Sequence, residues 1–389
     1  MKVHGLSNDW VEPDWPFLTL AEVDALLRRF PAAGGAKRIL SYSPRPFSAA
    51  SLVATPRGRV FVKRHPALAR DRAGLLEEHR LLRYLREHGG HVPAVLADED
   101  GETAIGTGPW TYEVHTVAAG LDLYEQALSW TPFRSVPQAR GAGRALAHLH
   151  WAAAGYQAQP RRAPTLVASF SIFAAEEPMA ALERYLEARP ALAEFLSRQD
   201  WRGKTETTLL PYHAELWPWL ASLAPLWTHN DFHASNLLWS SAAEDAEPVL
   251  VIDFGLADRT NAAYDLATAI ERNGVRWLAL DGAFAEVVQR EQILALLNGY
   301  EEVRPLTAAE AQAVRAMLPL VHAEFALSEA DYFLRVLRAE ERARLAWNEY
   351  FLGHAAWFGS DHGARLLDAL AEWAGRGHRA AGRPGDVRR

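Results

Sequence analysis

The sequence contains no cysteine among its 389 residues. This absence excludes disulfide bonds, thiolate zinc sites and cysteine nucleophiles together. It is typical of a protein that works in a reducing compartment, and we expect a cytoplasmic location.

Long apolar runs and a basic surplus are also missing. The longest uncharged stretch, 216–230, is interrupted by Pro218 and Pro225, whereas a membrane-spanning helix needs roughly 20 apolar residues. The stretch 1–15 includes acids and prolines and has no apolar core of the signal-peptide type. The formal net charge of -7 is opposite in sign to the basic excess of a general nucleic-acid binder. We therefore expect neither a membrane nor a nucleic acid as a partner.

What the sequence does contain is ordinary for a globular enzyme: 49% apolar and 23% charged residues, with a length that suits two lobes. Strand patterns dominate up to residue 115 and long helical patterns dominate beyond 120. The expected strands are 49–55, 59–62, 92–96 and 110–114, and the expected helices are a short one capped by Thr19, then 73–88, 139–154, 177–196 with a break at Pro190, 307–317 and 320–350. We predict an α+β fold with an N-terminal lobe at 1–115, a C-terminal lobe at 116–375 and a disordered tail at 376–389.

The sharpest signal is a short polar motif. Residues 229–236 read H-N-D-F-H-A-S-N, in which Asp231 and Asn236 stand five apart and His229 precedes the aspartate by two. The pattern H-x-D-x-x-x-x-N arises by chance in roughly one or two per cent of chains this long. Asp253 follows seventeen residues after Asn236, at the end of an apolar strand pattern.

Phosphoryl transfer needs these groups. Asp231 is the candidate base that aligns a nucleophilic hydroxyl and accepts its proton. Asn236 and Asp253 offer an amide oxygen and a carboxylate, a hard-oxygen site for Mg²⁺ that a triphosphate would complete. Taken singly, each residue is better explained as a turn cap or a loop residue. Their order, their spacing and the hairpin pattern between them favour a catalytic site.

The motif resembles the catalytic loop of the aminoglycoside phosphotransferase and choline kinase superfamily, which has the protein-kinase fold. That loop reads H-G-D-x-H-x-x-N, and this chain departs from it at Asn230, where the chemical groups are kept but the conformational freedom of glycine is lost. By the same resemblance, Asp265 in Y-D-L-A matches the aspartate that helps to hold the loop. His229 would orient the loop rather than carry a proton. The implied architecture is bilobal, with a small β-rich N-terminal lobe and a larger, mostly helical C-terminal lobe.

The resemblance also implies ATP as the phosphoryl donor and a role for Lys63. This lysine follows the strand pattern 60–62. In a kinase fold such a lysine contacts the α- and β-phosphates and is held by a glutamate on the next helix. Glu78 is the expected partner, with the adjacent Glu77 as the alternative.

Two further parts of the nucleotide site are expected from the resemblance. The connection between the lobes should lie near 112–120, where backbone groups around His115 and Val117 would pair with adenine. The segment that covers the phosphates should lie within 41–51, which contains no glycine. Its small residues at 48–51 would let backbone amides approach the phosphates.

The acceptor is expected to be a hydroxyl of a small molecule such as an amino-alcohol, an aminosugar or aminoglycoside, or a homoserine-like compound. Two faces of the expected helix 320–350 carry polar groups, one with Glu324 and Asp331, the other with His322 and Glu329. A solvated acidic face explains them equally well. The 14 tryptophans permit an aromatic cage for a quaternary ammonium group, although core packing is the commoner use of large aromatic residues.

Two other functions stay open. A protein kinase is disfavoured because D-F-G at 253–255 leads directly to 264–266 without an A-P-E activation segment. A catalytically inactive nucleotide-binding or scaffold protein is the second alternative. The complete set of Lys63, Asp231 and the two metal-ligand candidates argues against it, whereas the glycine-free segment 41–51 supports it.

Overall fold

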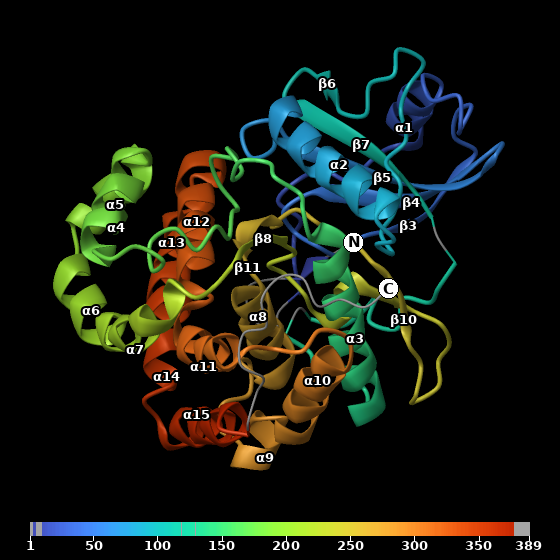
Figure 1. Cartoon of the computed structure of the whole chain (residues 1–389). Helices are drawn as coiled ribbons and strands as arrows, with labels where there is room; N and C mark the ends of the chain where they lie inside the picture. The colour runs from blue at the N-terminus through green and yellow to red at the C-terminus, as the bar shows by residue number, and fades with distance from the viewer. Residues whose placement is uncertain (1–2, 5–9, 118, 129, 377–389) are drawn as a thin grey trace.

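The N-terminal lobe is built on a five-stranded antiparallel sheet with strand order β3-β4-β5-β7-β6. The computed structural model describes residues 3–4, 10–117, 119–128 and 130–376 (Figure 1). The elements of this lobe are β1 (Val3–His4), β2 (Trp10–Val11), α1 (Leu20–Leu27), β3 (Arg38–Tyr42), β4 (Ala49–Thr55), β5 (Gly58–Pro66), α2 (Arg72–Glu87), β6 (Ile105–Thr107) and β7 (Trp110–Thr116).

The two faces of this sheet serve different purposes. In the pairing of β5 with β7, Val62 lies opposite Val114 and Lys63 lies opposite Glu113. Because side chains alternate between the faces of a strand, the valines pack into the core formed with α1. Lys63 and Glu113 therefore point to the other face, where Glu113 meets His79 of α2.

Both helices of this lobe begin where the sequence predicts. Thr19 caps α1 in a capping box with Glu22, and Asp71 caps α2 by accepting a hydrogen bond from the Gly74 amide at 2.7 Å. The expected strand 92–96 is wrong, because only an isolated bridge between Val95 and His115 forms there. Pro93 lies within this segment and has no N–H to donate to a ladder.

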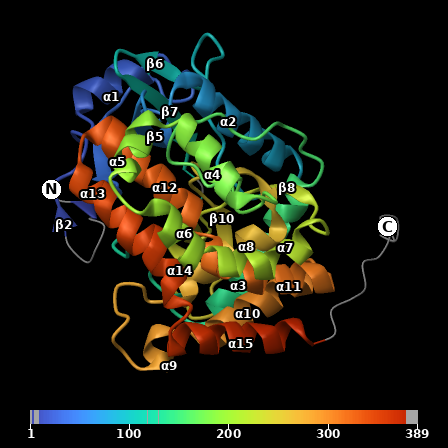
Figure 2. The same cartoon turned by 90° about the vertical axis from the view of Figure 1, so that its left-hand side faces the viewer.

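The larger lobe is mostly helical. Its strands are β8 (Pro225–Thr228), β9 (Leu237–Trp239), β10 (Pro248–Val251) and β11 (Asp258–Asn261). Its α-helices are α3 (Val136–Ala153), α4 (Pro178–Glu187), α5 (Pro190–Ser197), α6 (Trp201–Thr208), α7 (Leu210–Leu220), α8 (Ala262–Gly274), α9 (Phe284–Val287), α10 (Arg290–Val303), α11 (Ala308–Met317), α12 (Ala323–Tyr332), α13 (Glu340–Leu345), α14 (His354–Trp357) and α15 (Asp361–Ala374). The predicted α+β bilobal architecture is confirmed (Figures 1 and 2).

Two short strand pairs carry the predicted motif between the helices. β8 pairs with β11 and β9 pairs with β10, both antiparallel. The segment 229–236 leaves β8 and enters β9 through a single 3-10 turn, Ala234–Asn236. Asp253 follows β10 after a single residue, Ile252. The hairpin expected between Asn236 and Asp253 is thus present, and it returns the chain to the same edge.

The expected continuous helix 320–350 is wrong. It is divided by two π-helical turns, Phe333–Leu337 and Ala346–Gly353, and by Arg338, whose φ of 57° is left-handed. A left-handed residue cannot continue a right-handed helix. The resulting segments α12, α13 and α14 succeed one another along one side of the lobe, with α15 at the end far from the sheet (Figure 2).

A segment before α1 bridges the two lobes. Trp15 packs edge-on against Trp110 of β7, with ring centroids 5.3 Å apart, and its indole N–H donates to the Tyr332 hydroxyl of α12 at 3.0 Å. Next to it, Asp14 is ion-paired with Arg342 of α13. We call residues 14–16 the lobe bridge, because the chain here contacts both lobes at once.

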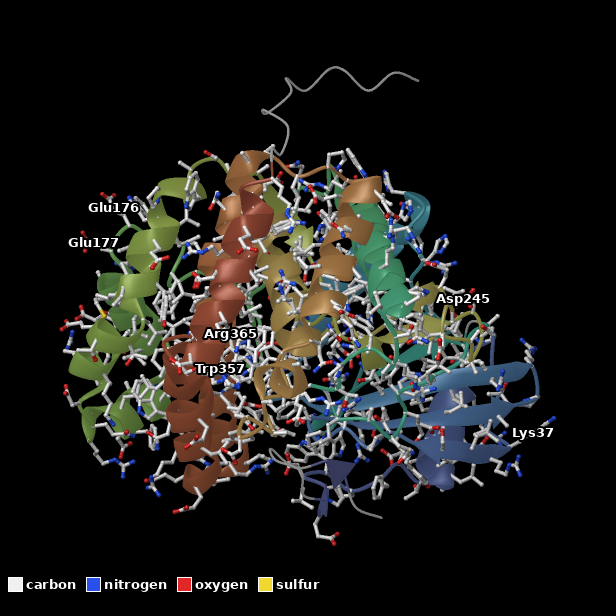
Figure 3. All side chains as sticks on the ribbon, turned by 90° about the horizontal axis from the view of Figure 1, so that it is seen from below. Lys37, Glu176, Glu177, Asp245, Trp357 and Arg365 are labelled. Atoms are coloured by element: carbon white, nitrogen blue, oxygen red, sulfur yellow. The ribbon has the colours of Figure 1, made fainter. Side chains whose placement is uncertain are left out.

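The outer surface is polar. Figure 3 shows Lys37 at one end of the molecule, and Glu176 and Glu177 at the other, with their side chains directed outward. Within the described part of the chain, no helix is both long and apolar enough to cross a membrane. The tail expected at 376–389 lies outside the described residues apart from Arg376.

Two glycines allow α3 and α10 to pack with their backbones in contact. A methyl group at Gly143 would overlap the Leu296 carbonyl, and one at Gly299 would overlap the Arg140 carbonyl. No side chain fits at either position without moving a helix. This contact holds α3 against the rest of the larger lobe.

We predict that Gly143→Ala destabilises the protein by about 1–3 kcal/mol, because the added methyl group overpacks the α3–α10 contact. Gly106→Ala is the matched control, since a methyl group there meets no atom within 4 Å. Urea unfolding would measure both. Equal stability of the two variants would show that α3 and α10 can separate at no cost.

Candidate active site

The predicted site residues converge on one cavity between the lobes. It has a volume of about 550 Å³. Its lining includes seven of the nine candidates, namely Lys63, Glu78, His115, Val117, Asp231, Asn236 and Asp253. His229 and Asp265 lie behind the wall and contact the loop that carries Asp231.

Asp265, in the first turn of α8, holds the start of this loop. Its two carboxylate oxygens accept hydrogen bonds from the backbone N–H groups of His229 and Asn230, both at 2.8 Å. His150 of α3 lies 3.0 Å from the same carboxylate. Burial by itself raises the pKa of Asp265, but the hydrogen bond and charge of His150 outweigh it, and the pKa is lowered. The buried carboxylate is therefore ionised, which strengthens both backbone hydrogen bonds.

The His229 ring joins the loop to Ile252, the residue between β10 and Asp253. Its Nε2 lies 3.0 Å from the Ile252 carbonyl, which can only accept, so Nε2 carries a proton. Its Nδ1 accepts the backbone N–H of Asp231 at 3.2 Å. Both ring nitrogens are thus used, and His229 has none left to transfer a proton. This geometry is what the predicted orienting role requires.

Asn230 occupies a backbone conformation that favours glycine. Its φ is 61°, in the left-handed region that asparagine enters more readily than other side chains do. Its side-chain oxygen accepts from the Thr228 hydroxyl at 2.7 Å, and its amide donates to the carbonyls of Ala168 and Leu256 at 3.0 and 3.2 Å. The departure from the glycine of the family motif therefore keeps the loop conformation and adds contacts to it.

Asp231 faces the cavity between two cationic or potentially cationic groups. Its Oδ1 lies 3.1 Å from Arg272 of α8, and its Oδ2 lies 3.6 Å from His233. Burial by itself raises the pKa of Asp231, but the Arg272 charge and His233 outweigh it and bring the pKa well below its usual value. Asp231 is therefore an ionised, weakly basic carboxylate at neutral pH.

Asn236 and Asp253 line the cavity together with this carboxylate. The Asn236 amide donates to the Asp231 carbonyl at 2.9 Å, so its side-chain nitrogen is engaged and its oxygen is the atom left for a cation. Asp253 accepts a hydrogen bond from Lys63 Nζ at 2.9 Å. One amide oxygen and one carboxylate fit the oxygen preference of Mg²⁺.

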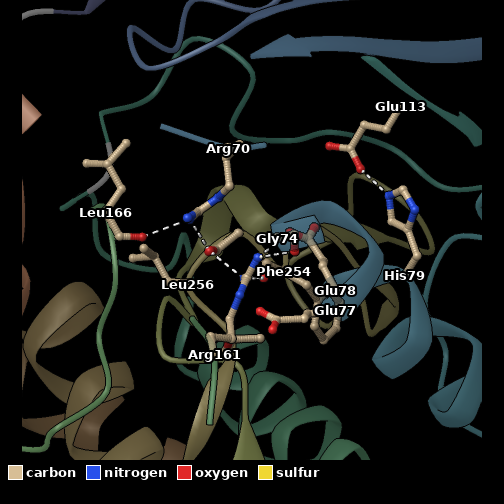
Figure 4. Close-up of polar contacts among 12 residues, drawn as sticks. Arg70, Gly74, Glu77, Glu78, His79, Glu113, Arg161, Leu166, Phe254 and Leu256 are labelled. Carbon is tan, nitrogen blue, oxygen red and sulfur yellow. Dashed lines mark hydrogen bonds and ion pairs between the residues drawn. The ribbon is translucent and has the colours of Figure 1, made fainter. Parts of the chain in front are cut away.

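Lys63 supplies a positive charge to the part of the cavity lined by Asn236 and Asp253. Burial by itself lowers the pKa of Lys63, but the charges of Asp253 and Glu113 outweigh it and the pKa is raised. Glu78, the expected partner, instead lies 3.4 Å from Arg161. Figure 4 shows Arg161 between Glu78 and the Gly74 carbonyl.

Glu113 takes part in a separate hydrogen-bonded network. One of its oxygens lies 2.9 Å from His79 and the other lies 2.9 Å from His65 (Figure 4 shows His79). His115 also lies 2.9 Å from it. Glu113 was not among the residues predicted from the sequence, although pairing the two predicted strands places it opposite Lys63 in the sheet.

The segment 41–51 covers one side of the cavity. Its ends are joined by a hydrogen bond from the Ser43 amide to the Ala50 carbonyl at 2.9 Å, and Phe47 packs edge-on against Tyr332 of α12. Burial lowers the pKa of Arg45. The negative charges of Asp231, Asp122 and Asp253 offset part of that effect. The segment 41–51 has no glycine to bring its backbone amides close to a phosphate, but the Arg45 side chain supplies a positive charge there.

The end of the cavity beyond Asp231 combines aromatic and acidic groups. Trp130 and Phe325 flank Arg272, whose guanidinium carbon lies 5.8 and 5.5 Å from their ring centroids. Glu329 lines the same end, and burial raises its pKa to about 8. Of the two faces expected on 320–350, the one with His322 and Glu329 lines the cavity, whereas Glu324 accepts hydrogen bonds from Ser171.

Arg272 is a further residue that the sequence analysis missed. It lies seven positions after Asp265 on α8, and residues at this spacing share one face of a helix. Since Asp265 was expected to contact the catalytic loop, the same face could have pointed to Arg272. The contact between Arg272 and Asp231 follows from this geometry.

This chain is similar to known proteins in both sequence and fold. Residues 47–306 match the model of the phosphotransferase enzyme family. The chain is similar to a homoserine kinase of Azorhizobium caulinodans, 31% identical over 173 residues that make up 44% of this chain and 45% of that protein. The match therefore spans less than half of that relative.

Two solved structures show the same fold. One is a microcompartment-associated aminopropanol kinase, with a TM-score of 0.55, 17% identity and coverage of 90% of this chain and 100% of that chain. The other is an amicoumacin kinase in complex with AMP-PNP, Ca²⁺ and Ami, with a TM-score of 0.52, 16% identity and coverage of 86% and 88%.

We predict that the wild type is the most stable, that Asn230→Gly is less stable, and that Asn230→Ala is the least stable. Both variants lose the side-chain hydrogen bonds, each worth about 1 kcal/mol net. Only alanine must also be held in the left-handed region, at a further cost of about 1–2 kcal/mol. Urea unfolding would measure the order, and an alanine variant as stable as the glycine variant would show that the loop changes its backbone conformation.

Proposed function

This chain belongs to the phosphotransferase enzyme family, and we propose that it transfers the γ-phosphoryl group of ATP to a hydroxyl group of a small molecule. The observation that carries this proposal is the convergence of Lys63, Asp231, Asn236 and Asp253 on one cavity. These residues come from both lobes and supply a cation, a base and two oxygen ligands.

In the proposed mechanism, Asp231 accepts a hydrogen bond from the acceptor hydroxyl and directs its oxygen toward the γ-phosphorus. The bond from this phosphorus to the β–γ bridging oxygen breaks as the new bond forms, and ADP is the leaving group. The low pKa of Asp231 makes it a weak base at neutral pH. The proton therefore moves to Asp231 only when the new oxygen–phosphorus bond is largely formed and the hydroxyl has become acidic. Asp265 and His229 act earlier, because they hold the backbone on both sides of Asp231 in place.

The phosphates would be held by groups from both lobes. Asn236 and Asp253 would bind Mg²⁺, which neutralises the charge that develops on the β- and γ-phosphates. Lys63 would turn toward the phosphate oxygens when the nucleotide enters, because its ammonium group can then interact with both Asp253 and the phosphates. Arg45 would contribute a second positive charge from the covering segment.

Val117 is the stronger of the two adenine-pairing candidates. The backbone of His115 is already part of the sheet, where it pairs with Phe61 on one side and bridges Val95 on the other. Val117 is the first residue beyond β7, and it also lines the cavity.

For the acceptor we propose a small amino-alcohol or aminosugar-like compound. The end of the cavity beyond Asp231 offers the faces of Trp130 and Phe325 and the carboxyl group of Glu329. An ammonium group is attracted by aromatic faces. Its positive charge would also favour the ionised form of Glu329, whose pKa burial otherwise raises to about 8. The similarity to homoserine and aminopropanol kinases supports this choice.

We predict that Asp231→Asn lowers turnover roughly 10²–10⁴-fold, because the amide keeps the shape of the carboxylate but cannot accept the proton. The measurement is ADP release with ATP, Mg²⁺ and a panel of amino-alcohols, aminoglycosides, homoserine and sugars. Asp245→Asn is the matched control, since that side chain is exposed and points away from the molecule (Figure 3).

The outcomes separate the proposal from its alternatives. Turnover that survives Asp231→Asn would contradict the assigned mechanism. Thermal stabilisation by ATP and Mg²⁺ without turnover on any acceptor would favour an inactive nucleotide-binding protein. The absence of both effects would favour a scaffold protein.

We further predict that Arg272→Gln moves the acidic limb of the kcat/KM profile to higher pH. The Arg272 charge favours the ionised form of Asp231 and lowers its pKa, so its removal raises the pKa and protonates the base at a higher pH. Arg272→Lys keeps the charge and should leave the limb close to its wild-type position. Identical profiles for the two variants would show that Arg272 does not set the ionisation of Asp231.

A further inference from the structure

A cluster of one carboxylate and two imidazoles lies behind Arg272 and takes no part in the proposed reaction. Glu271 belongs to α8, His322 precedes α12, and His354 begins α14. All three side chains are buried, with 1%, 5% and 8% of their surface exposed. Three elements distant in sequence thus bring metal-ligating atoms to one point.

The spacing of these atoms suits a tetrahedral metal ion. Oε1 of Glu271 lies 3.5 Å from Nδ1 of His322 and 3.0 Å from Nδ1 of His354. Ligand atoms at about 2.0–2.1 Å from a tetrahedral Zn²⁺ are about 3.3 Å apart, as the bond lengths and the tetrahedral angle require. The two measured separations lie on either side of this value.

The hydrogen-bond geometry within the cluster is poor. Among the described residues, His354 Nδ1 lies 3.0 Å from Glu271 Oε1, but no well-aligned hydrogen bond reaches either carboxylate oxygen of Glu271. A buried carboxylate without hydrogen bonds is costly unless another cation compensates it. Arg272 Nε lies 3.7 Å from the second oxygen, but its guanidinium also faces Asp231 at 3.1 Å.

The second His-carboxylate cluster of the chain provides the comparison. Glu113 accepts hydrogen bonds from His79 and His65, both at 2.9 Å, and the other nitrogen of His79 is hydrogen-bonded to Thr103. Both oxygens of the Glu113 carboxylate therefore accept hydrogen bonds. The Glu271 cluster has the same residue types, but its nitrogen–oxygen contacts are not aligned as hydrogen bonds, which leaves its oxygen and nitrogen atoms placed to coordinate a cation.

The surroundings of the cluster would hold its ligands in place. The His354 ring is stacked flat on Trp277, with centroids 3.8 Å apart and planes 7° apart. Trp277 also donates its indole N–H to the Glu271 carbonyl at 3.0 Å, and Trp130 packs against both imidazoles. An apolar shell that fixes ligand orientation is characteristic of metal sites.

We propose that Glu271, His322 and His354 bind one divalent transition-metal ion, with Zn²⁺ as the best match to two nitrogens and one oxygen. This site differs from the Mg²⁺ site proposed at Asn236 and Asp253, because Mg²⁺ prefers oxygen ligands alone. The ion ties α8, α12 and α14 together directly behind Arg272. Its fourth position is left for water, since three protein ligands are present.

The test uses the full chain, produced without a polyhistidine tag, stripped with a chelator and dialysed against Zn²⁺ or Co²⁺ in the absence of nucleotide. We expect one tightly bound Zn²⁺ per chain by mass spectrometry of the metal. We expect Co²⁺ to show the intense visible bands of a tetrahedral complex. The thermal unfolding temperature should rise on metal addition and fall with chelator, because an ion that binds only the folded state stabilises it.

Four variants locate the ion. His354→Gln and His322→Gln should each lose the bound metal and the cobalt bands. His79→Gln, in the hydrogen-bonded cluster, and Asp253→Asn, in the proposed Mg²⁺ site, should each retain them. Circular dichroism would establish that every variant is folded before its metal content is measured.

Two results would overturn the proposal. One is a wild-type chain that takes up no Zn²⁺ beyond weak surface binding and gives only the faint bands of octahedral Co²⁺. The other is loss of the metal in Asp253→Asn with retention in the folded His354→Gln variant. Both readouts need neither ATP nor turnover, so failure of this site and failure of the proposed function can be told apart.

Discussion

The whole site depends on one interaction: two adjacent backbone N–H groups donate hydrogen bonds to the Asp265 carboxylate. His229 and Asn230 cannot turn without breaking these bonds, and Asp231 is the next residue. Because the carboxylate is buried and ionised, breaking them would leave a charge in an apolar interior. The position of Asp231, the proposed base, is therefore determined by α8, a helix of the packed core, rather than by the loop that carries it.

The same helix governs the charge of the site as well as its shape. Along α8, Asp265 holds the loop and Arg272, seven residues later on the same face, contacts the Asp231 carboxylate. The adjacent Glu271 faces the buried imidazoles. A displacement of α8 would therefore change the backbone position, the base strength and the histidine cluster together.

The sequence predicted those parts of the site that are encoded locally. Asp231, Asn236 and Asp253 were recognisable because two strands and a hairpin bring them together within a short stretch. The partner of Glu78 was not, because Arg161 reaches it from a segment without periodic pattern. The same limit applies to the false strand at 92–96, where Pro93 outweighs an apolar pattern, and to 320–350, where a left-handed Arg338 divides a continuous helical periodicity. The assigned roles of these residues stay predictions, whereas their grouping around one cavity is a feature of the fold.

The lobe bridge at residues 14–16 adds a tie between the lobes besides the covalent connection after β7 and the Lys63–Asp253 bond. Trp15 contacts Trp110 of one lobe and Tyr332 of the other, so the lobes cannot separate without the loss of one of these contacts. Tyr332 is fully buried and also contacts Phe47 of the segment that covers the cavity. One buried ring therefore attaches both the lobe bridge and the covering segment to α12. A change at Tyr332 would loosen both of these segments at once, although neither is its neighbour in the sequence.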